Sequence, residues 1–207
     1  MKTCLIISGG EFAPLPDTLK YDFVIACDHG YDYALRLQIT PDLIMGDFDS
    51  CNTDIGAVNG IPVETFPVAK DDTDTMLAIK KAISLGYNNI ILACALGARF
   101  DHAIANIQSM AYAALHECEC ELYGNSDYFC TMVRGSKTFS AAENSSFSLF
   151  SLTDSCKGVS ISGAEYDCEN ITLTNTFPLG VSNKWKADSI TVSLTEGILL
   201  VVESLYR

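Results

Sequence analysis

The first half of the sequence repeats one pattern, in which a short apolar run is followed at once by glycine or charged residues. The clearest example is the run 43–45, which leads into Gly46 and then the carboxylates Asp47 and Asp49. Apolar runs of this length that alternate with helical patterns are typical of buried parallel strands in an α/β fold. Ligands of such folds bind beyond the carboxyl ends of the strands, so the pattern also predicts where a functional site lies.

Two carboxylates one residue apart repel each other unless a cation lies between them. Asp47 and Asp49 therefore predict a Mg²⁺ site for a phosphorylated substrate, because this ion takes carboxylate oxygens as ligands. The alternative is a polar loop in which Asp49 or Ser50 caps the helix that follows. This stretch alone favours neither interpretation.

A second polar cluster, residues 70–74, stands immediately before a helical pattern at 76–85. Helix capping and the helix dipole account for one or two acidic residues at such a start. They do not account for three aspartates beside Lys70. Asp71 and Asp74 are three residues apart, so we expect them on one face of the first turn, where they suit a metal and a bound phosphate.

A third cluster follows the strand expected at 89–95 and opens a helix expected at 101–118. Arg99 carries a planar fork of donors that suits phosphate oxygens. Asp101 either caps the helix or orients Arg99, and His102 is either a base or a structural residue of the first turn. Parallel strands end at one edge of a sheet, so the three clusters are expected to converge and to supply the groups that phosphoryl transfer needs.

Two further strand ends give weaker signals. Gly9 and Gly10 follow the strand expected at 4–7, where they form either a plain tight turn or a backbone surface that a phosphate approaches. This glycine pair matches neither the dinucleotide-binding fingerprint nor the P-loop pattern. Asp28 closes a second expected strand, Phe23–Cys27, and is followed by His29.

The alternation of strands and helices stops near residue 124. Beyond it lie short runs separated by turn residues, and Ile190, Val192 and Leu194 alternate with polar neighbours, as in a half-buried antiparallel strand. The sequence therefore predicts a parallel-sheet α/β domain over 1–127 and a small antiparallel β-sandwich domain over 128–207.

The charge of the chain limits its partners. Its 207 residues carry a formal net charge of -13 at pH 7, which argues against nucleic-acid binding because that requires a basic surface. An anionic substrate must instead be met by a metal, a few lysine or arginine side chains and helix N-termini. No apolar run suits a membrane span or a signal peptide. The nine cysteines are odd in number and several lie in apolar runs, so we expect a cytoplasmic protein with reduced thiols.

Taken together, the polar clusters resemble the signature blocks of the thiamine pyrophosphokinase family in order and approximate spacing. The resemblance covers nearly the whole chain. It rests on Asp28 and Gly30, residues 41–50, Lys70, Asp71, Thr73 and Asp74, residues 97–102 with Asn106, Gly158, Val159, Gly163, Tyr166 and residues 179–183. It implies a Rossmann-like ATP-binding domain followed by a thiamine-binding sandwich, a homodimer, and Mg²⁺-assisted transfer of a diphosphoryl group from ATP to the hydroxyethyl oxygen of thiamine.

The resemblance also implies roles for residues of the first domain. The metal ligands are Asp47, Asp49 and Asp74. Asp71 lies beside the metal, Arg99 contacts the triphosphate, and Asp101 orients Arg99 or the nucleophilic hydroxyl. The other residues expected to contact the nucleotide are Gly9, Gly10, Asp28, Lys70 and Thr73.

In the second domain the resemblance places Ser182 and Asn183 against the pyrimidine ring of thiamine. Trp185 is the only tryptophan. Its ring either stacks on the cationic thiazolium or anchors the sandwich. Tyr166 is expected in the core.

Two positions depart from the family pattern, which usually has glycine where this chain has His29 and Ala98. His29 either alters nucleotide preference or points outward. Two other functions stay open: a diphosphotransferase that acts on a different alcohol, and a non-catalytic binder of thiamine or thiamine diphosphate.

Overall fold

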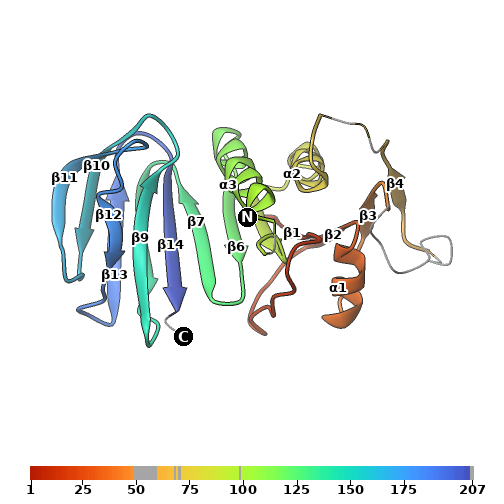
Figure 1. The fold of residues 1–207 in the computed structure, drawn as a ribbon, viewed down its shortest axis with the longest axis horizontal. Coiled ribbons are helices and arrows are strands. Elements are labelled where there is room, and N and C mark those ends of the chain that lie inside the picture. Colours follow the sequence, from red (N-terminus) through yellow and green to blue (C-terminus); the bar gives the residue numbers. More distant parts are fainter. Residues whose placement is uncertain (49–59, 68, 70, 98, 206–207) are drawn as a thin grey trace. The chain divides into compact units, whose positions relative to one another are not determined.

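The computed structural model describes residues 1–48, 60–67, 69, 71–97 and 99–205. The chain divides into two compact units, Met1–Asn125 and Ser126–Arg207. Figure 1 shows them as a ribbon coloured from red at the N-terminus to blue at the C-terminus. The described helices belong to the first unit, and the described part of the second unit is built from strands.

The first unit is built on a parallel sheet. Its strands are β1 (Thr3–Ile7), β2 (Phe23–Cys27), β3 (Leu43–Gly46), β4 (Val63–Thr65), β5 (Asn89–Ala93) and β6 (Glu119–Tyr123). Among the described residues the order is β6-β5-β1-β2-β3-β4, and neighbouring strands run parallel. The chain leaves β1 toward β2 and returns on its other side at β5, so the order reverses between β1 and β5. Open α/β sheets bind ligands at such a reversal, beyond the carboxyl ends of the strands.

The strands of this sheet are apolar on both faces. All four residues of β1 after Thr3 are buried, and so are the four residues of β2 after Phe23. A strand that is buried on both faces has no polar alternation, which explains the short continuous apolar runs in the sequence. The polar residues are left for the strand ends, where they meet at one edge.

Three described helices accompany the sheet: α1 (Gly30–Arg36), α2 (Asp74–Ser84) and α3 (Phe100–Leu115). The Thr73 hydroxyl accepts a hydrogen bond from the Met76 N–H at 3.2 Å and so caps α2. None of these helices combines the length and the apolar character that crossing a membrane requires.

The helix boundaries correct two expectations. Because Thr73 takes the capping position, α2 begins at Asp74, and Asp71 lies exposed ahead of the helix rather than in its first turn. The helix expected at 101–118 ends at Leu115, and the N–H of Cys118 bonds back to the Ala113 carbonyl at 3.0 Å. That contact turns the chain out of the helix and into β6.

The second unit is an antiparallel β-sandwich, as predicted. One sheet has the order β12-β9-β14-β7 and the other β11-β10-β13-β8. The strands are β7 (Asp127–Met132), β8 (Gly135–Ser140), β9 (Ser145–Ser151), β10 (Ser155–Ser162), β11 (Cys168–Thr174), β12 (Gly180–Asn183), β13 (Ser189–Leu194) and β14 (Leu199–Leu205).

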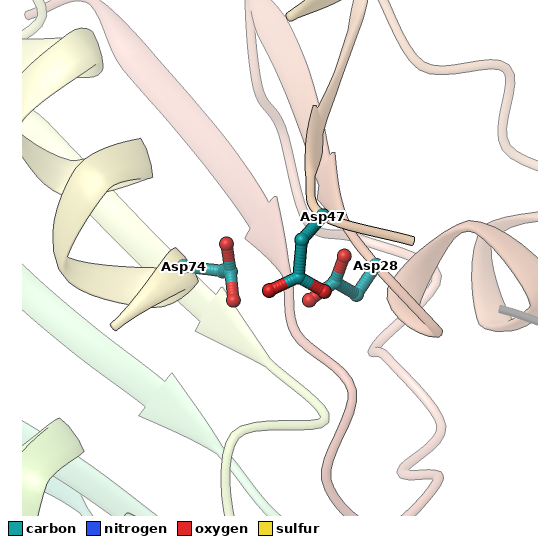
Figure 2. A group of neighbouring side chains, drawn as sticks. All are labelled: Asp28, Asp47 and Asp74. Atoms are coloured by element: carbon teal, nitrogen blue, oxygen red, sulfur yellow. The ribbon is translucent and has the colours of Figure 1, made fainter. Parts of the chain in front are cut away.

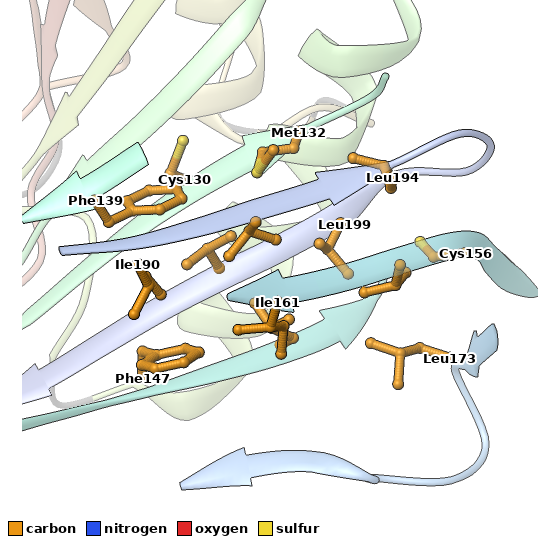
Figure 3. Packing of buried hydrophobic residues seen from close by; sticks show 14 of the residues in the cluster. Cys130, Met132, Phe139, Phe147, Cys156, Ile161, Leu173, Ile190, Leu194 and Leu199 are labelled. Atoms are coloured by element: carbon orange, nitrogen blue, oxygen red, sulfur yellow. The ribbon is translucent and has the colours of Figure 1, made fainter. Parts of the chain in front are cut away.

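The core of the sandwich explains which strands the sequence revealed. Figure 3 shows the buried side chains of this core, among them Phe147, Ile190 and Leu199. Strand β13 carries the alternating apolar residues that predict it, and β14 begins with the continuous apolar run LLVV. Strands β8 and β12 were not predicted as strands, because their sequences GSKTFS and GVSN contain few apolar residues.

Candidate active site

Three carboxylates converge at the carboxyl ends of the parallel strands. Asp28 follows β2, Asp47 follows β3, and Asp74 is the first residue of α2. One oxygen from each lies within 4.8 Å of the others, and Figure 2 shows the three side chains gathered in one place. Two of the predicted metal ligands, Asp47 and Asp74, are thus brought together, and Asp28 joins them.

The backbone around Gly46 explains how Asp28 reaches this group. Gly46 has a φ of +154°, and a Cβ atom there would lie 1.9 Å from Oδ1 of Asp28, so only glycine leaves room for the carboxylate. The Phe48 N–H donates to the same Oδ1 at 2.9 Å. Asp28 itself has a left-handed φ of 46°. These contacts hold the Asp28 carboxylate against the end of β3.

The surroundings of Asp28 change the protonation of its own carboxylate. The pKa of Asp28 is raised to about 6, first by burial, and also by the neighbouring carboxylates of Asp74 and Asp47, while the Phe48 N–H acts in the opposite direction. Three carboxylates grouped this closely are a set that a divalent cation stabilises. Carboxylate oxygens are also the donors that Mg²⁺ takes, so the donor set fits this ion.

A cavity of about 710 Å³ lies beside the carboxylates in the first unit. Asp28 and Asp74 line it, together with residues that follow β1 and β5 and residues of α3. Its other lining residues include Ser8, Gly9, Gly10, Thr73, Thr75, Arg99, His102 and Asn106. The volume falls in the range of small-molecule sites, roughly 300–1,000 Å³.

The glycine turn Gly9–Gly10 after β1 forms part of this lining. A Cβ atom at Gly10 would lie 2.3 Å from the carbonyl oxygen of Leu96, and the Gly10 N–H donates to the Cys94 carbonyl at 2.8 Å. Packing against the segment after β5 therefore requires glycine at position 10, whether or not a phosphate approaches. The role of both glycines in nucleotide binding stays a prediction.

Buried polar groups fix the wall of the cavity. The hydroxyl oxygens of Ser8 and Thr75 lie 2.9 Å apart, and both residues are buried. Asn106 donates from Nδ2 to the Ala95 carbonyl at 2.6 Å. A carbonyl only accepts, so this contact fixes the amide orientation and makes Oδ1 of Asn106 the acceptor on its other side. The sequence assigned no role to Ser8 or Thr75, since a lone hydroxyl gives no motif.

Arg99 and Asp101 form the predicted pair at the start of α3. Nη2 of Arg99 lies 2.7 Å from Oδ2 of Asp101, and the two side chains are 69% and 66% exposed. The hydrogen bond from Arg99 lowers the pKa of Asp101, which therefore stays ionised. Arg99 also lines the cavity. Its predicted contact with phosphate oxygens stays a prediction.

Some predicted residues do not join this group. Those outside the described part of the chain are Asp49, Lys70 and Ala98. Asp71 is exposed and is not one of the three grouped carboxylates. Its neighbour Asp72 accepts from Nζ of Lys80 at 2.7 Å, so one aspartate of the 70–74 cluster stabilises α2 by an ion pair.

In the second unit, the side chains of Asn183 and Trp185 make contacts that stabilise the sandwich. Buried Asn183 accepts from the Tyr166 N–H at 3.1 Å and donates to the Tyr166 carbonyl at 2.9 Å. These bonds hold the backbone of Tyr166 while the residue is 67% exposed, so the expectation that Tyr166 lies in the core is wrong. Trp185 packs on Phe147, with ring centroids 5.1 Å apart, and donates to Oγ of Ser145 at 2.8 Å.

Ser182 on β12 differs from its neighbour Asn183 because it is exposed. Its φ is 58°, an uncommon value for a residue other than glycine. Its N–H donates to Oγ of Ser148 at 3.0 Å, which helps to hold this conformation. The predicted contact of Ser182 with thiamine stays a prediction.

The features at this sheet edge define a class of protein. Grouped carboxylates that suit a divalent cation lie beyond the ends of parallel strands, beside a cavity lined by an arginine and a glycine turn. This combination is typical of α/β domains that bind a nucleotide and transfer phosphoryl groups.

Comparisons with known proteins identify the family within that class. The family model described as "Thiamin pyrophosphokinase, catalytic domain" matches residues 18–122, and "Thiamin pyrophosphokinase, vitamin B1 binding domain" matches residues 137–199. The chain belongs to the thiamin pyrophosphokinase family. The resemblance noted in the sequence is confirmed.

Individual relatives align with nearly all of this chain. The curated thiamine pyrophosphokinase of Bacillus subtilis is 26% identical over 212 residues, covering 99% of each chain. A crystal structure of thiamine pyrophosphokinase from Bacillus subtilis superposes with a TM-score of 0.88 at 25% identity and covers 100% of both chains. The enzyme of Candida albicans, at 15% identity, shares the fold with a TM-score of 0.78 over 98% of this chain and 89% of its own.

Proposed function

We propose that this protein transfers a diphosphoryl group from ATP to the hydroxyethyl oxygen of thiamine, giving thiamine diphosphate and AMP. The observation that carries the proposal is the group of Asp28, Asp47 and Asp74, two of which line a nucleotide-sized cavity. The family model for the catalytic domain covers all three carboxylates. Membership of the family indicates thiamine and ATP as the substrates, and the grouped carboxylates indicate where the reaction takes place.

Mg²⁺ is the cofactor that this group suits. Asp28, Asp47 and Asp74 would hold the ion, with Asp49 as a further ligand expected from the sequence. When bound, Mg²⁺ neutralises the charge that develops on the phosphate oxygens during transfer. The same three carboxylates repel a triphosphate when no cation is present, so the binding of metal and nucleotide is expected to be coupled.

The protein's own groups position the reactants. Arg99 binds phosphate oxygens, Asp101 holds its guanidinium, and Lys70 is a further expected contact. The N-terminal end of α2, where Thr73, Asp74 and Thr75 line the cavity, adds the positive end of a helix dipole. A bond forms between the hydroxyethyl oxygen and the β-phosphorus, and the bond from that phosphorus to the oxygen of AMP breaks. The hydroxyl proton passes to a carboxylate or to water.

The second unit is assigned to the thiamine side because the vitamin B1 binding model matches it. Ser182, Asn183 and Trp185 are the candidate contacts, and the first of these is the exposed one. A different alcohol acceptor would be selected by the same residues. A non-catalytic binder of thiamine would have no need of three grouped carboxylates, so this alternative is disfavoured.

We further propose a homodimer in the cytoplasm. The dimer rests on the family alone. The cytoplasm is supported by thiols suited to a reducing compartment: burial raises the pKa of Cys4 to about 12 and also raises the pKa of Cys94, so both stay protonated and unreactive.

The test is AMP release from ATP in the presence of Mg²⁺, with and without thiamine. The thiamine product is identified by mass spectrometry. Thiamine-dependent AMP and a diphosphate product are expected. Asp74→Asn and Asp49→Asn should abolish turnover while thermal melting shows a folded protein. ADP with a monophosphate product would instead make the protein an ordinary kinase, and near-normal turnover of either variant would remove the metal role of that residue.

A further inference from the structure

His29, which caps the start of α1, joins a stack of side chains beside this helix. Its Nδ1 lies 2.8 Å from Oδ2 of Asp32. Its ring meets the ring of Tyr33 edge-on, with centroids 4.6 Å apart and an interplanar angle of 71°. His29 is therefore held on two sides, by an acceptor and by an aromatic ring of the same short helix.

Tyr33 connects His29 to the glycine turn, because it contacts both. Its hydroxyl donates to the carbonyl oxygen of Gly10 at 2.8 Å. Burial raises the pKa of Tyr33, so the phenol stays protonated and remains a donor. The ring of Phe12, two residues beyond the turn, lies 5.6 Å from that of Tyr33, and the Arg36 guanidinium covers Phe12 at 3.6 Å. We call His29, Tyr33, Phe12 and Arg36 the α1 stack.

The glycine turn Gly9–Gly10 is thereby held from opposite sides. On the β5 side, the N–H of Gly10 bonds to the Cys94 carbonyl at 2.8 Å. On the α1 side, Tyr33 bonds to the Gly10 carbonyl, and a Cβ atom built on Gly9 would lie 3.2 Å from Cβ of His29. Gly9 and Gly10 line the cavity, whereas His29 and Tyr33 do not.

We propose that His29 is a positioning residue for the nucleotide, which acts through Tyr33 to hold Gly9–Gly10 in the shape that lines the cavity. The inference rests on the proposed function in that it takes the cavity to be the nucleotide site. A turn that is ordered before binding need not lose conformational freedom on binding, so the α1 stack strengthens nucleotide binding without touching the nucleotide. Thiamine is assigned to the other unit, so the α1 stack is not expected to change the affinity for thiamine.

The variants separate the parts of this path. His29→Gly removes the ring, and His29→Phe keeps a ring against Tyr33 without the contact to Asp32. Tyr33→Phe removes only the bond to Gly10. The matched control is His116→Gly, since His116 stacks on Tyr112 with centroids 4.2 Å apart at the end of α3 and lines no part of the cavity. Circular dichroism and thermal melting establish that each variant is folded.

The readout is the dissociation constant of a non-hydrolysable ATP analogue with Mg²⁺ by calorimetry, together with KM for ATP, KM for thiamine and kcat. Loss of one neutral hydrogen bond that orders the turn is expected to weaken nucleotide binding about fivefold. We expect that change in His29→Gly and Tyr33→Phe, with KM for thiamine and kcat within about twofold of wild type. His29→Phe should stay near wild type, and so should His116→Gly.

The double variant His29→Gly/Tyr33→Phe tests whether the two residues act on one path. It should weaken nucleotide binding no more than the larger single change, because both remove the same restraint on Gly10. Additive effects, equal changes in both KM values, or unchanged nucleotide binding in folded His29→Gly would each overturn the proposal, as would a wild type that binds no nucleotide. If the wild-type protein binds the analogue but does not convert thiamine, the proposed function is refuted. The binding constants of the variants still decide whether His29 positions the nucleotide.

Discussion

Replacing Asp28 with asparagine should stabilise the metal-free protein and at the same time remove its response to Mg²⁺. In the absence of a cation, Asp28 is half-buried beside the carboxylates of Asp47 and Asp74, so its ionised form is disfavoured. Asparagine has nearly the same shape and no charge. It also keeps an oxygen for the Phe48 N–H, and it tolerates the left-handed φ of 46° at this position.

The magnitude follows from the pKa. Folding raises the pKa of Asp28 from 3.8 to about 6, a shift worth about 3 kcal/mol at 1.36 kcal/mol per unit. Asp28 is only half-buried, so solvent screening reduces this to roughly 1–2 kcal/mol. At about 2–4 °C per kcal/mol for a chain of this size, Asp28→Asn should raise Tm by about 2–8 °C at neutral pH.

The pH dependence has a definite sign. Because the folded pKa of Asp28 lies above the unfolded value, its contribution to stability is fully present below about pH 4 and is lost as pH rises through about 6. The variant lacks this titration. Its advantage over wild type should therefore be largest at pH 7.5 and should shrink toward pH 5.

The assay is thermal melting in a chelator at pH 5, 6 and 7.5, repeated with Mg²⁺. Wild type should gain Tm with Mg²⁺, and Asp28→Asn should gain much less and lose turnover. The control is Asp101→Asn, since the pKa of Asp101 is lowered by Arg99 and its loss removes no repulsion. The reasoning fails if Asp28→Asn is no more stable than wild type at pH 7.5 in chelator, or if its advantage does not change with pH.

Three further substitutions test other parts of the structure. Gly46→Ala places a Cβ atom 1.9 Å from Oδ1 of Asp28, so it should lower stability by more than about 2 kcal/mol in urea unfolding and abolish turnover; an active, equally stable variant would contradict the geometry. Trp185→Phe loses the bond to Ser145 and should cost about 1 kcal/mol of unfolding free energy with KM for thiamine unchanged, whereas a tenfold higher KM would indicate stacking on the substrate. Arg99→Gln breaks an exposed ion pair, so unfolding should change by less than about 0.5 kcal/mol while KM for ATP rises about tenfold; an unchanged KM would remove its contact with phosphate.

Much of the fold follows from local sequence, because buried parallel strands leave polar residues only at their ends. That rule predicts Asp47 and Asp74 at one edge of the sheet, and both lie there. The alternation of Ile190, Val192 and Leu194 likewise marked a sandwich strand, and all three residues are buried. In both cases the local sequence pattern of a strand is enough to predict where its residues lie.

The features that the sequence missed depend on contacts between elements. Asp28 was expected only as a nucleotide contact. It joins the carboxylate group because Gly46 on the neighbouring strand leaves room for its side chain. The helix start was misplaced because one hydroxyl, that of Thr73, takes the cap and leaves Asp71 outside. Tyr166 was expected in the core from its residue type, but bonds from buried Asn183 to its backbone hold it at the surface.

The acidic character of the chain gives the carboxylate group a second consequence. With a net charge of -13, the protein repels a triphosphate unless local groups reverse the sign of the field at the cavity. Two lysines of α2 do not serve this purpose, since Lys80 pairs with Asp72 and Lys81 pairs with Glu64. A cation held by Asp28, Asp47 and Asp74 would reverse that sign beside Arg99. Because coupling between two ligands is reciprocal, a metal that favours ATP must be favoured by ATP to the same extent. The acidic surface then favours metal-bound ATP over free ATP, because it repels a polyphosphate that carries no cation.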